Sequence, residues 1–252
     1  LLVFGVARGT GARVWVKDAG TGLFHRRFNF AFPERPVDVA VLPSYAGTPA
    51  PEIAVLLDIP KQNRSEIRVR DGQSGAQFAK IVLPEDRVYQ YLRPLSDFAG
   101  AVAVGELATV SLDADNGRPR LLVVDGRTGE MLSERAFPEP FVPIALEALP
   151  SFSGSRADEL LLWTRRPGSL RPRGYVVDAG TMVNLGTPTL ADKQVPRAIA
   201  LLPNIGRSDA IDAVVVAAAP RDLRQRAFLF DGRGSQIRPL RYHEASRQWF
   251  AV

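Results

Sequence analysis

The chain has 252 residues, a formal net charge of +5, 46% hydrophobic residues and 23% charged residues. This composition is too apolar for a disordered protein, and no apolar run approaches the roughly 20 residues that span a bilayer. It contains no cysteine and two histidines, which excludes disulfides, thiolate catalysis and cysteine-based metal sites.

Short strand signals separated by glycine and proline follow one another along the whole chain. The first, Leu1–Val6, reads as the middle of a strand, so we expect the sequence to be a piece of a longer one. In the second repeat the strand signals lie at 37–42, 52–58, 65–71 and 76–83, and they are named strands A to D. Later B strands are nearly continuous apolar runs, which indicates burial on both faces. The last signal is Gln248–Val252.

Two sequence markers recur with one period. An aspartate that ends strand C, before a glycine-rich turn, returns every 53 or 54 residues, at Asp18, Asp71, Asp125, Asp178 and Asp231. A Leu-Pro and glycine motif precedes an acidic residue that starts strand B, at Glu52, Glu106, Glu159 and Asp212. Two markers in phase predict a structural repeat of about 53 residues.

Four antiparallel strands in each repeat predict an all-β fold, the β-propeller, with five four-stranded blades. The chain is then a single propeller domain. The last strand would complete the N-terminal blade and close the ring. The predicted blades are residues 247–252 with 1–32, then 37–83, 88–137, 142–190 and 196–240.

The Leu-Pro, Gly, Glu-Leu marker followed by the Asp-x-x-Thr-Gly hairpin resembles the FG-GAP/VCBS-type propeller repeats of integrin-like heads and bacterial surface proteins. The resemblance implies an adhesive or scaffolding role and a location in the bacterial envelope or outside the cell. Such repeats often carry a calcium loop between strands A and B. Here each loop holds a single acid at most (Asp97, Asp158 and Asp209), too few for calcium, so no metal site is predicted.

The same hairpin also resembles the turn of quinoprotein propellers. The tryptophan that packs between blades in those proteins has no counterpart here, so no cofactor is predicted. The repeated aspartate itself is expected to form an Asx turn, in which its carboxylate accepts backbone N–H groups.

Acidic residues also recur in the connections from strand D to the next strand A, at Glu34, Asp86, Glu139, Asp192 and Glu244. In a propeller these connections lead to the innermost strands and converge on one end of the channel. The acids could bind a cation, or serve as the paired carboxylates of a glycosidase. The alternative is solvated charge inherited by duplication, which the similarity of the loops favours.

The connections between strands B and C are basic and lie at the same end as the D–A connections. Arginine forks suit phosphate, sulfate and carboxylate groups. The candidate contact residues on this face are Arg64, Arg118, Arg120, Arg165, Arg166, Arg173 and Arg224. Charged hairpin tips that keep the protein soluble are the alternative.

These patterns predict a non-enzymatic binding or scaffold module that contacts a protein or an anionic glycan through this face. Nucleic acid is not expected, because basic and aromatic residues are not interleaved. A glycan-active enzyme and a structural subunit of a larger assembly are the two alternatives. The sequence determines neither the ligand nor the oligomeric state.

Overall fold

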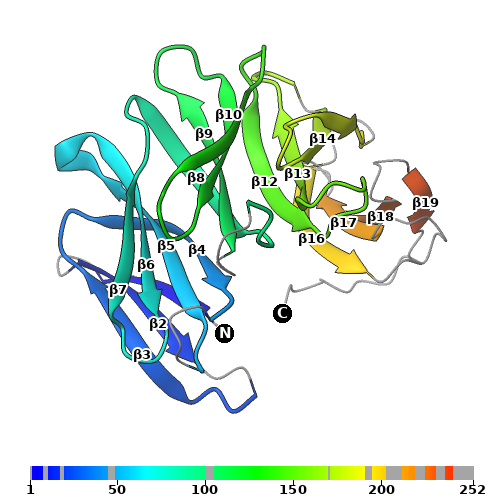
Figure 1. The fold of residues 1–252 in the computed structure, drawn as a ribbon. Coiled ribbons are helices and arrows are strands. Elements are labelled where there is room, and N and C mark those ends of the chain that lie inside the picture. The colour runs from blue at the N-terminus through cyan, green and yellow to red at the C-terminus, as the bar shows by residue number, and fades with distance from the viewer. Residues whose placement is uncertain are drawn as a thin grey trace. The chain divides into compact units, whose positions relative to one another are not determined.

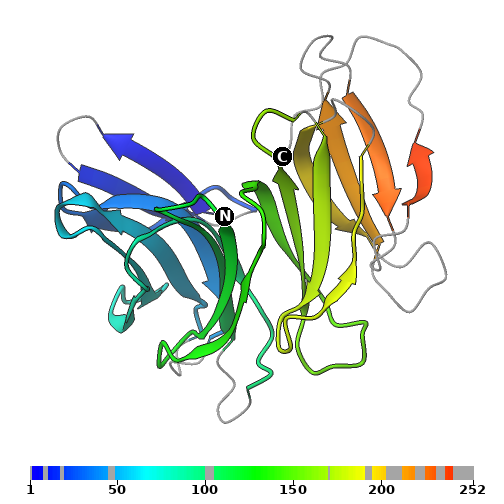
Figure 2. The ribbon, with the colours of Figure 1, turned by 90° about the horizontal axis from the view of Figure 1, so that it is seen from above.

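The computed structural model describes residues 2–7, 11–17, 20–44, 49–99, 105–169, 171–190, 195–202, 212–218, 225–230 and 236–240. They form 19 β-strands and one short 3₁₀-helix, arranged in five antiparallel sheets (Figures 1 and 2). The chain divides into two compact units, Leu1–Glu139 and Pro140–Val252. Within the described ranges, no helix is long and apolar enough to cross a membrane.

The first unit holds three sheets, each with its strands in chain order or its reverse. The three-stranded sheet contains β1 (Leu2–Ala7), β2 (Gly11–Lys17) and β3 (Phe24–Phe30). The next contains β4 (Arg35–Leu42), β5 (Glu52–Ile59), β6 (Arg64–Asp71) and β7 (Gln77–Val82), with the 3₁₀-helix η1 (Pro60–Gln62) between β5 and β6. The third contains β8 (Arg87–Pro94), β9 (Glu106–Asp113), β10 (Pro119–Asp125) and β11 (Met131–Ala136).

The second unit holds two four-stranded sheets. One contains β12 (Val142–Leu149), β13 (Glu159–Arg165), β14 (Pro172–Asp178) and β15 (Asn184–Gly186). The other contains β16 (Val195–Leu202), β17 (Asp212–Ala218), β18 (Gln225–Phe230) and β19 (Gln236–Leu240).

The strand pattern predicted from the sequence is confirmed. The four strands expected in the first full repeat correspond to β4–β7 within two residues at every end. The all-β, four-stranded antiparallel organisation of a propeller is therefore present. Closure by the last strand concerns residues 247–252, which lie outside the described residues, so the five-bladed ring stays a prediction.

The repeated aspartate shapes the turn between strands C and D, as expected. Asp125 Oδ1 accepts the backbone N–H groups of Arg127 (2.9 Å) and Thr128 (2.5 Å). Asp178 Oδ1 binds the backbone N–H and the hydroxyl of Thr181, both at 2.7 Å. Asp71 makes the same turn with Gln73 and Ser74. The first and last aspartates of the series, Asp18 and Asp231, lie outside the described residues.

The acidic residue that starts strand B holds the A–B loop from inside. Glu106 is fully buried and accepts the backbone N–H groups of Phe98 (3.1 Å) and Ala99 (3.0 Å). Glu159 does the same for Phe152 (3.1 Å) and Ser153 (3.0 Å). These carboxylates replace the loop's missing backbone partners, and this explains why the acid recurs in phase with the Leu-Pro motif.

Apolar side chains between neighbouring sheets form the core of each unit. In the first unit Phe28 and Phe30 of β3 meet Ile53, Val55 and Leu57 of β5. On its other face, the sheet β4–β7 packs against the sheet β8–β11. In the second unit the buried Trp163 of β13 packs edge-on against Phe230 of β18, with ring centroids 5.8 Å apart. Burial on both faces explains the continuous apolar runs of the B strands.

Candidate functional site: an arginine pocket

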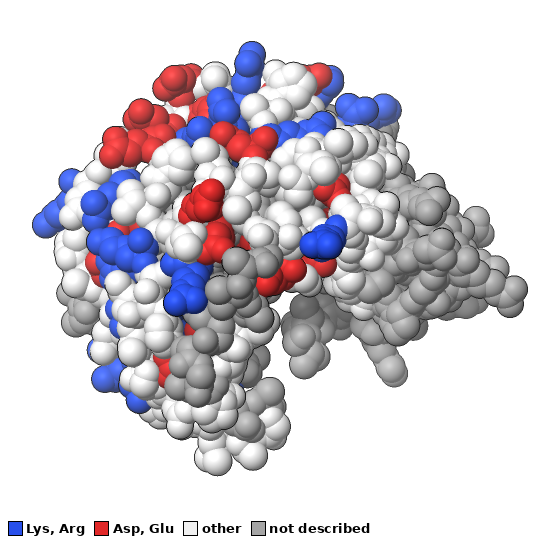
Figure 3. Space-filling view, viewed as in Figure 1, with Lys and Arg blue, Asp and Glu red and all other residues white. Residues whose placement is uncertain are grey.

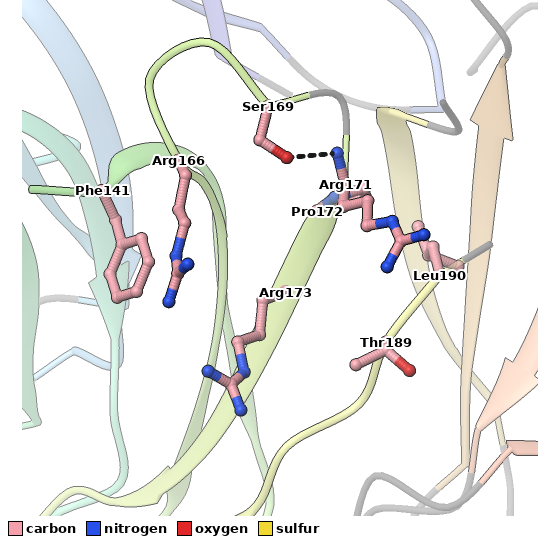
Figure 4. Close-up of a pocket in the computed structure, with 8 residues that line it drawn as sticks. All are labelled: Phe141, Arg166, Ser169, Arg171, Pro172, Arg173, Thr189 and Leu190. Carbon is pink, nitrogen blue, oxygen red and sulfur yellow. Dashed lines mark hydrogen bonds between the residues drawn. The ribbon is translucent and has the colours of Figure 1, made fainter. Parts of the chain in front are cut away.

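A pocket of about 420 Å³ opens at one end of the sheet β12–β15. The B–C loop between β13 and β14 supplies Arg166, Ser169 and Arg171, and β14 begins with Pro172 and Arg173. The remaining wall comes from Phe141, before β12, and from Thr189 and Leu190, after β15 (Figure 4). The pocket is therefore built from B–C and D–A connections. These connections lie at the end of the sheet for which the sequence predicts the contact face.

Two of the three arginines are positioned by aromatic rings. The guanidinium carbon of Arg166 lies 5.9 Å from the ring centroid of Phe141, and that of Arg173 lies 5.7 Å from the ring centroid of Tyr175. The two rings are 5.9 Å apart and tilted by 46°. A ring fixes a guanidinium through a cation–π contact of about 0.5–1 kcal/mol at an exposed site and leaves its positive charge in place.

The eight described lining residues include three arginines and no acidic side chain, so together they carry net positive charge. In Figure 4 Arg166 and Arg173 point their guanidinium groups to the same side, whereas Arg171 turns toward Leu190. Exposed guanidiniums without a carboxylate in the same lining are suited to bind an anion in a bidentate manner.

The walls of the pocket are fixed by backbone contacts. The N–H of Gly174 donates to the carbonyl of Pro188 (2.7 Å), and this bond ties the segment after β15 to β14. A β-carbon at Gly174 would lie 2.6 Å from Pro188 Cγ, so only glycine permits this approach. In the B–C loop the N–H of Arg171 donates to Ser169 Oγ (3.1 Å).

The predicted basic residues are divided between the two compact units. Arg166 and Arg173 line the pocket, and the half-buried Arg165 ends β13 beside the loop. The others within the described ranges, Arg64, Arg118 and Arg120, belong to the first unit. Arg224 lies outside the described residues.

Arg64 and Arg120 take part in ion pairs. Arg64 Nη2 lies 3.3 Å from Glu66, and Arg120 Nε lies 2.7 Å from Asp113. Arg118 is exposed. On the face seen in Figure 3, acidic and basic side chains are intermingled over the described part of the first unit. Of the seven predicted basic residues, only Arg166 and Arg173 are among the described residues that line the pocket, and the basic face as a whole stays a prediction.

The predicted ring of acids is divided among different local roles. Glu34 forms an ion pair with Arg68 and accepts the backbone N–H of Ala31 (3.1 Å). Asp86 is exposed and has a positive φ of 60°, and its carbonyl accepts the N–H of Ala114 (2.9 Å). Glu139 is half-buried. Asp192 and Glu244 lie outside the described residues.

No group of three or more histidine or acidic side chains that could hold a metal ion occurs in the described part of the chain. Among the described residues, acidic residues are cross-strand partners at three places, Glu52–Asp71, Glu106–Asp125 and Glu159–Asp178. Burial raises the pKa of Glu106, and burial together with the charge of Asp178 raises the pKa of Glu159. Burial also acts on Asp178, but hydrogen bonds from Ser155, Thr181 and Ser153 hold its pKa below the usual range.

Sequence reasoning missed five uncharged residues that line the site, namely Phe141, Ser169, Pro172, Thr189 and Leu190. Of these, Phe141, Thr189 and Leu190 come from two connections that are distant in sequence from the arginine-rich loop. The arginine density between Arg165 and Arg173 was the signal for one wall, and no local signal marks the other.

No protein-family model matches the chain. No curated protein sequence matches it either. The resemblance to FG-GAP/VCBS repeats therefore has no independent match.

Solved structures similar to this chain include propellers. The propeller of Dos1 is 17% identical with a TM-score of 0.54, and the match covers 93% of this chain and 55% of that one. Hydrazine synthase from Kuenenia stuttgartiensis is 12% identical with a TM-score of 0.58, covering 87% of this chain and 56% of that one. An apocarotenoid oxygenase from Synechocystis is 12% identical with a TM-score of 0.57, covering 96% and 58%.

The chain thus spans a little over half the length of these structures. At this identity the similarity concerns the fold alone. Together with the four-stranded antiparallel sheets, it identifies the fold as a β-propeller.

Proposed function

We propose that the chain is a non-enzymatic binding module that holds an anionic glycan at the arginine pocket of the sheet β12–β15. The observation that carries the proposal is the pair Arg166 and Arg173. Both guanidiniums are held on aromatic rings beside a pocket whose described lining residues include no acid. A group with a carboxylate or sulfate fits this arrangement.

The size and lining of the pocket favour a charged sugar over an extended protein surface. A volume of about 420 Å³ is at the low end for ligand pockets and suits one or two sugar residues. The hydroxyls of Ser169 and Thr189 add hydrogen-bonding groups beside the arginines. A location in the bacterial envelope or outside the cell, where acidic polysaccharides are displayed, belongs to the same proposal.

The test is binding of a heparin oligosaccharide and of a poly-glutamate peptide, measured by calorimetry at several salt concentrations. We expect Arg166→Gln and Arg173→Gln each to weaken heparin binding about tenfold, the loss typical of a charge-assisted hydrogen bond, and to flatten its salt dependence. The matched control is Arg127→Gln, an exposed arginine in a C–D turn.

Unchanged heparin affinity in both pocket variants would refute the proposal. Binding of poly-glutamate alone, lost in the same variants, would assign the pocket to an acidic protein partner and also refute the glycan assignment. The same oligosaccharides should remain uncleaved after long incubation, since a non-enzymatic module leaves its ligand intact.

A further inference from the structure

A second set of basic side chains lies between β3 and the sheet β4–β7, within the first unit. On β6, Glu66, Arg68 and Arg70 are the cross-strand partners of Leu57, Val55 and Ile53 of β5. Cross-strand partners share a face of the sheet. The three apolar partners pack against Phe28 and Phe30 of β3. Glu66, Arg68 and Arg70 therefore lie on the same face of the sheet as these apolar residues, the face that packs against β3.

Only part of this set is neutralised. Glu66 is completely buried and lies within 3.3 Å of Arg64, 2.5 Å of Arg68 and 3.3 Å of Lys80. Arg68 also pairs with Glu34 of the β3–β4 connection. Both carboxylates thus contact Arg68, and Glu66 also contacts Arg64 and Lys80.

Arg70 and Arg26 border the ring of Phe28 on β3. The guanidinium carbon of Arg70 lies 5.7 Å from the ring centroid. A β-carbon at Gly75 would lie 2.9 Å from Arg26 Nη1 and 3.5 Å from Phe28 Cε1, so the Arg26 guanidinium is beside the same ring. Burial and the charge of Arg68 lower the pKa of Arg70, which means that its charged form is disfavoured where it stands.

The Nε–H groups of three arginines in this set, Arg26, Arg64 and Arg70, are buried and have no hydrogen-bond partner among the described residues. A buried donor without a partner costs about 1–3 kcal/mol, more when the group is charged. Such groups in native proteins are commonly satisfied by a water molecule or an ion.

The neighbouring sheet shows what a balanced network looks like. Arg87 and Arg120 share Asp113 and Glu134, with N–O distances of 2.6 to 3.8 Å, so two cations face two acids. The β3–β6 set instead has two acids, Glu34 and Glu66, for five basic residues. These are Arg26, Arg64, Arg68, Arg70 and Lys80.

We propose that this β3–β6 set is a second anion-binding site, separate from the arginine pocket, in which Arg70 and Arg26 bind an oxyanion such as phosphate, sulfate or carboxylate beside Phe28. The anion would accept the buried Nε–H groups of Arg26 and Arg70 and supply the negative charge that the set lacks. The proposal does not depend on the function of the arginine pocket.

The experiment follows the arginine Nε–H signals of the full 252-residue chain by NMR during titration with inorganic phosphate, at an ionic strength held constant with sodium chloride. We expect saturable shifts of the Arg26 and Arg70 signals and slower exchange of their protons with water. Arg70→Gln should weaken phosphate binding about tenfold or more. Arg87→Gln, in the balanced network, is the matched control and should bind as the parent chain does.

Parallel titrations with sulfate and acetate distinguish the ligand classes by their relative affinities, because a site for carboxylates binds acetate at least as tightly as phosphate. Shifts that track ionic strength without saturation, or phosphate binding unchanged in both Arg70→Gln and Arg26→Gln, would overturn the proposal. Since the signals are read in the unmodified chain, a variant that fails to fold leaves the test intact. Arg166→Gln and Arg173→Gln should leave these signals unaffected, which separates this site from the arginine pocket.

Discussion

Removal of the Glu159 carboxylate should unfold the A–B loop that it holds. Glu159 accepts the backbone N–H groups of Phe152 at 3.1 Å and Ser153 at 3.0 Å. A hydrogen bond to a charged acceptor contributes about 1.5–3 kcal/mol. Relief of the repulsion from Asp178, its cross-strand neighbour, offsets part of the loss. We expect Glu159→Ala to lower the free energy of unfolding by about 2–4 kcal/mol.

The matched variant Glu159→Gln keeps one acceptor oxygen and removes the charge, so it should cost about 1 kcal/mol or less at neutral pH. The raised pKa of Glu159 means that its ionised form is disfavoured in the folded state. The stability due to this group is therefore complete below the pKa of the unfolded chain and is lost as the pH rises through the folded pKa. Glu159→Gln has no titrating group at this position. The free energy of unfolding of this variant should therefore rise relative to that of the parent chain as the pH rises from 4 to neutral pH.

The assay is urea unfolding followed by tryptophan fluorescence, to which the fully buried Trp163 contributes. A loss of less than about 0.5 kcal/mol for Glu159→Ala would refute the capping role, because it is smaller than the contribution of a single hydrogen bond. An equal loss for the alanine and glutamine variants would show that the charge, and not the acceptor, stabilises the loop.

Two further predictions concern the first unit. Gly129 has a φ of +76°, and a β-carbon there would lie 3.0 Å from Ile81 Cγ1. Gly129→Ala should therefore lower the free energy of unfolding by about 1–2 kcal/mol in the same urea assay. An unchanged free energy of unfolding would refute the tight packing of this turn. Burial raises the pKa of Tyr89 to about 12. In an ultraviolet titration, Tyr89→Phe should therefore lack the phenolate that forms at the highest pH in the parent chain. If the variant instead lacks a phenolate that forms near pH 10, the usual value for tyrosine, the prediction is wrong.

The repeat-forming features could be predicted from the sequence because they are local. An aspartate followed by glycine and threonine encodes its own turn, and the hydrogen bonds from Asp125 to residues two and three positions later confirm it. The alternation of apolar runs and turn residues likewise predicted the bounds of β4–β7 to within two residues. The acid at the start of strand B was visible as a marker. Its role as a hydrogen-bond acceptor for the A–B loop could be seen only in the structure.

The fate of individual charges could not be predicted, because it depends on partners that are distant in sequence. Glu34 looked like a member of a channel acid ring, yet its partner is Arg68 on β6. Arg120 looked like a contact residue, and it pairs with Asp113 across the β9–β10 hairpin. The net charge and the loop positions show how many basic residues there are, but they do not show which of them are neutralised by an ion pair.

The way in which an arginine is held decides whether it can serve an anionic ligand. Arg120 is held by carboxylates, and an approaching anion would have to displace them and meet their repulsion. Arg166 and Arg173 lie on aromatic rings, and a ring fixes a guanidinium without neutralising its positive charge. Arg70 combines a ring contact with a buried, unpartnered Nε–H. Aromatic support of an arginine therefore accompanies both sites proposed for anions, whereas carboxylates hold Arg120.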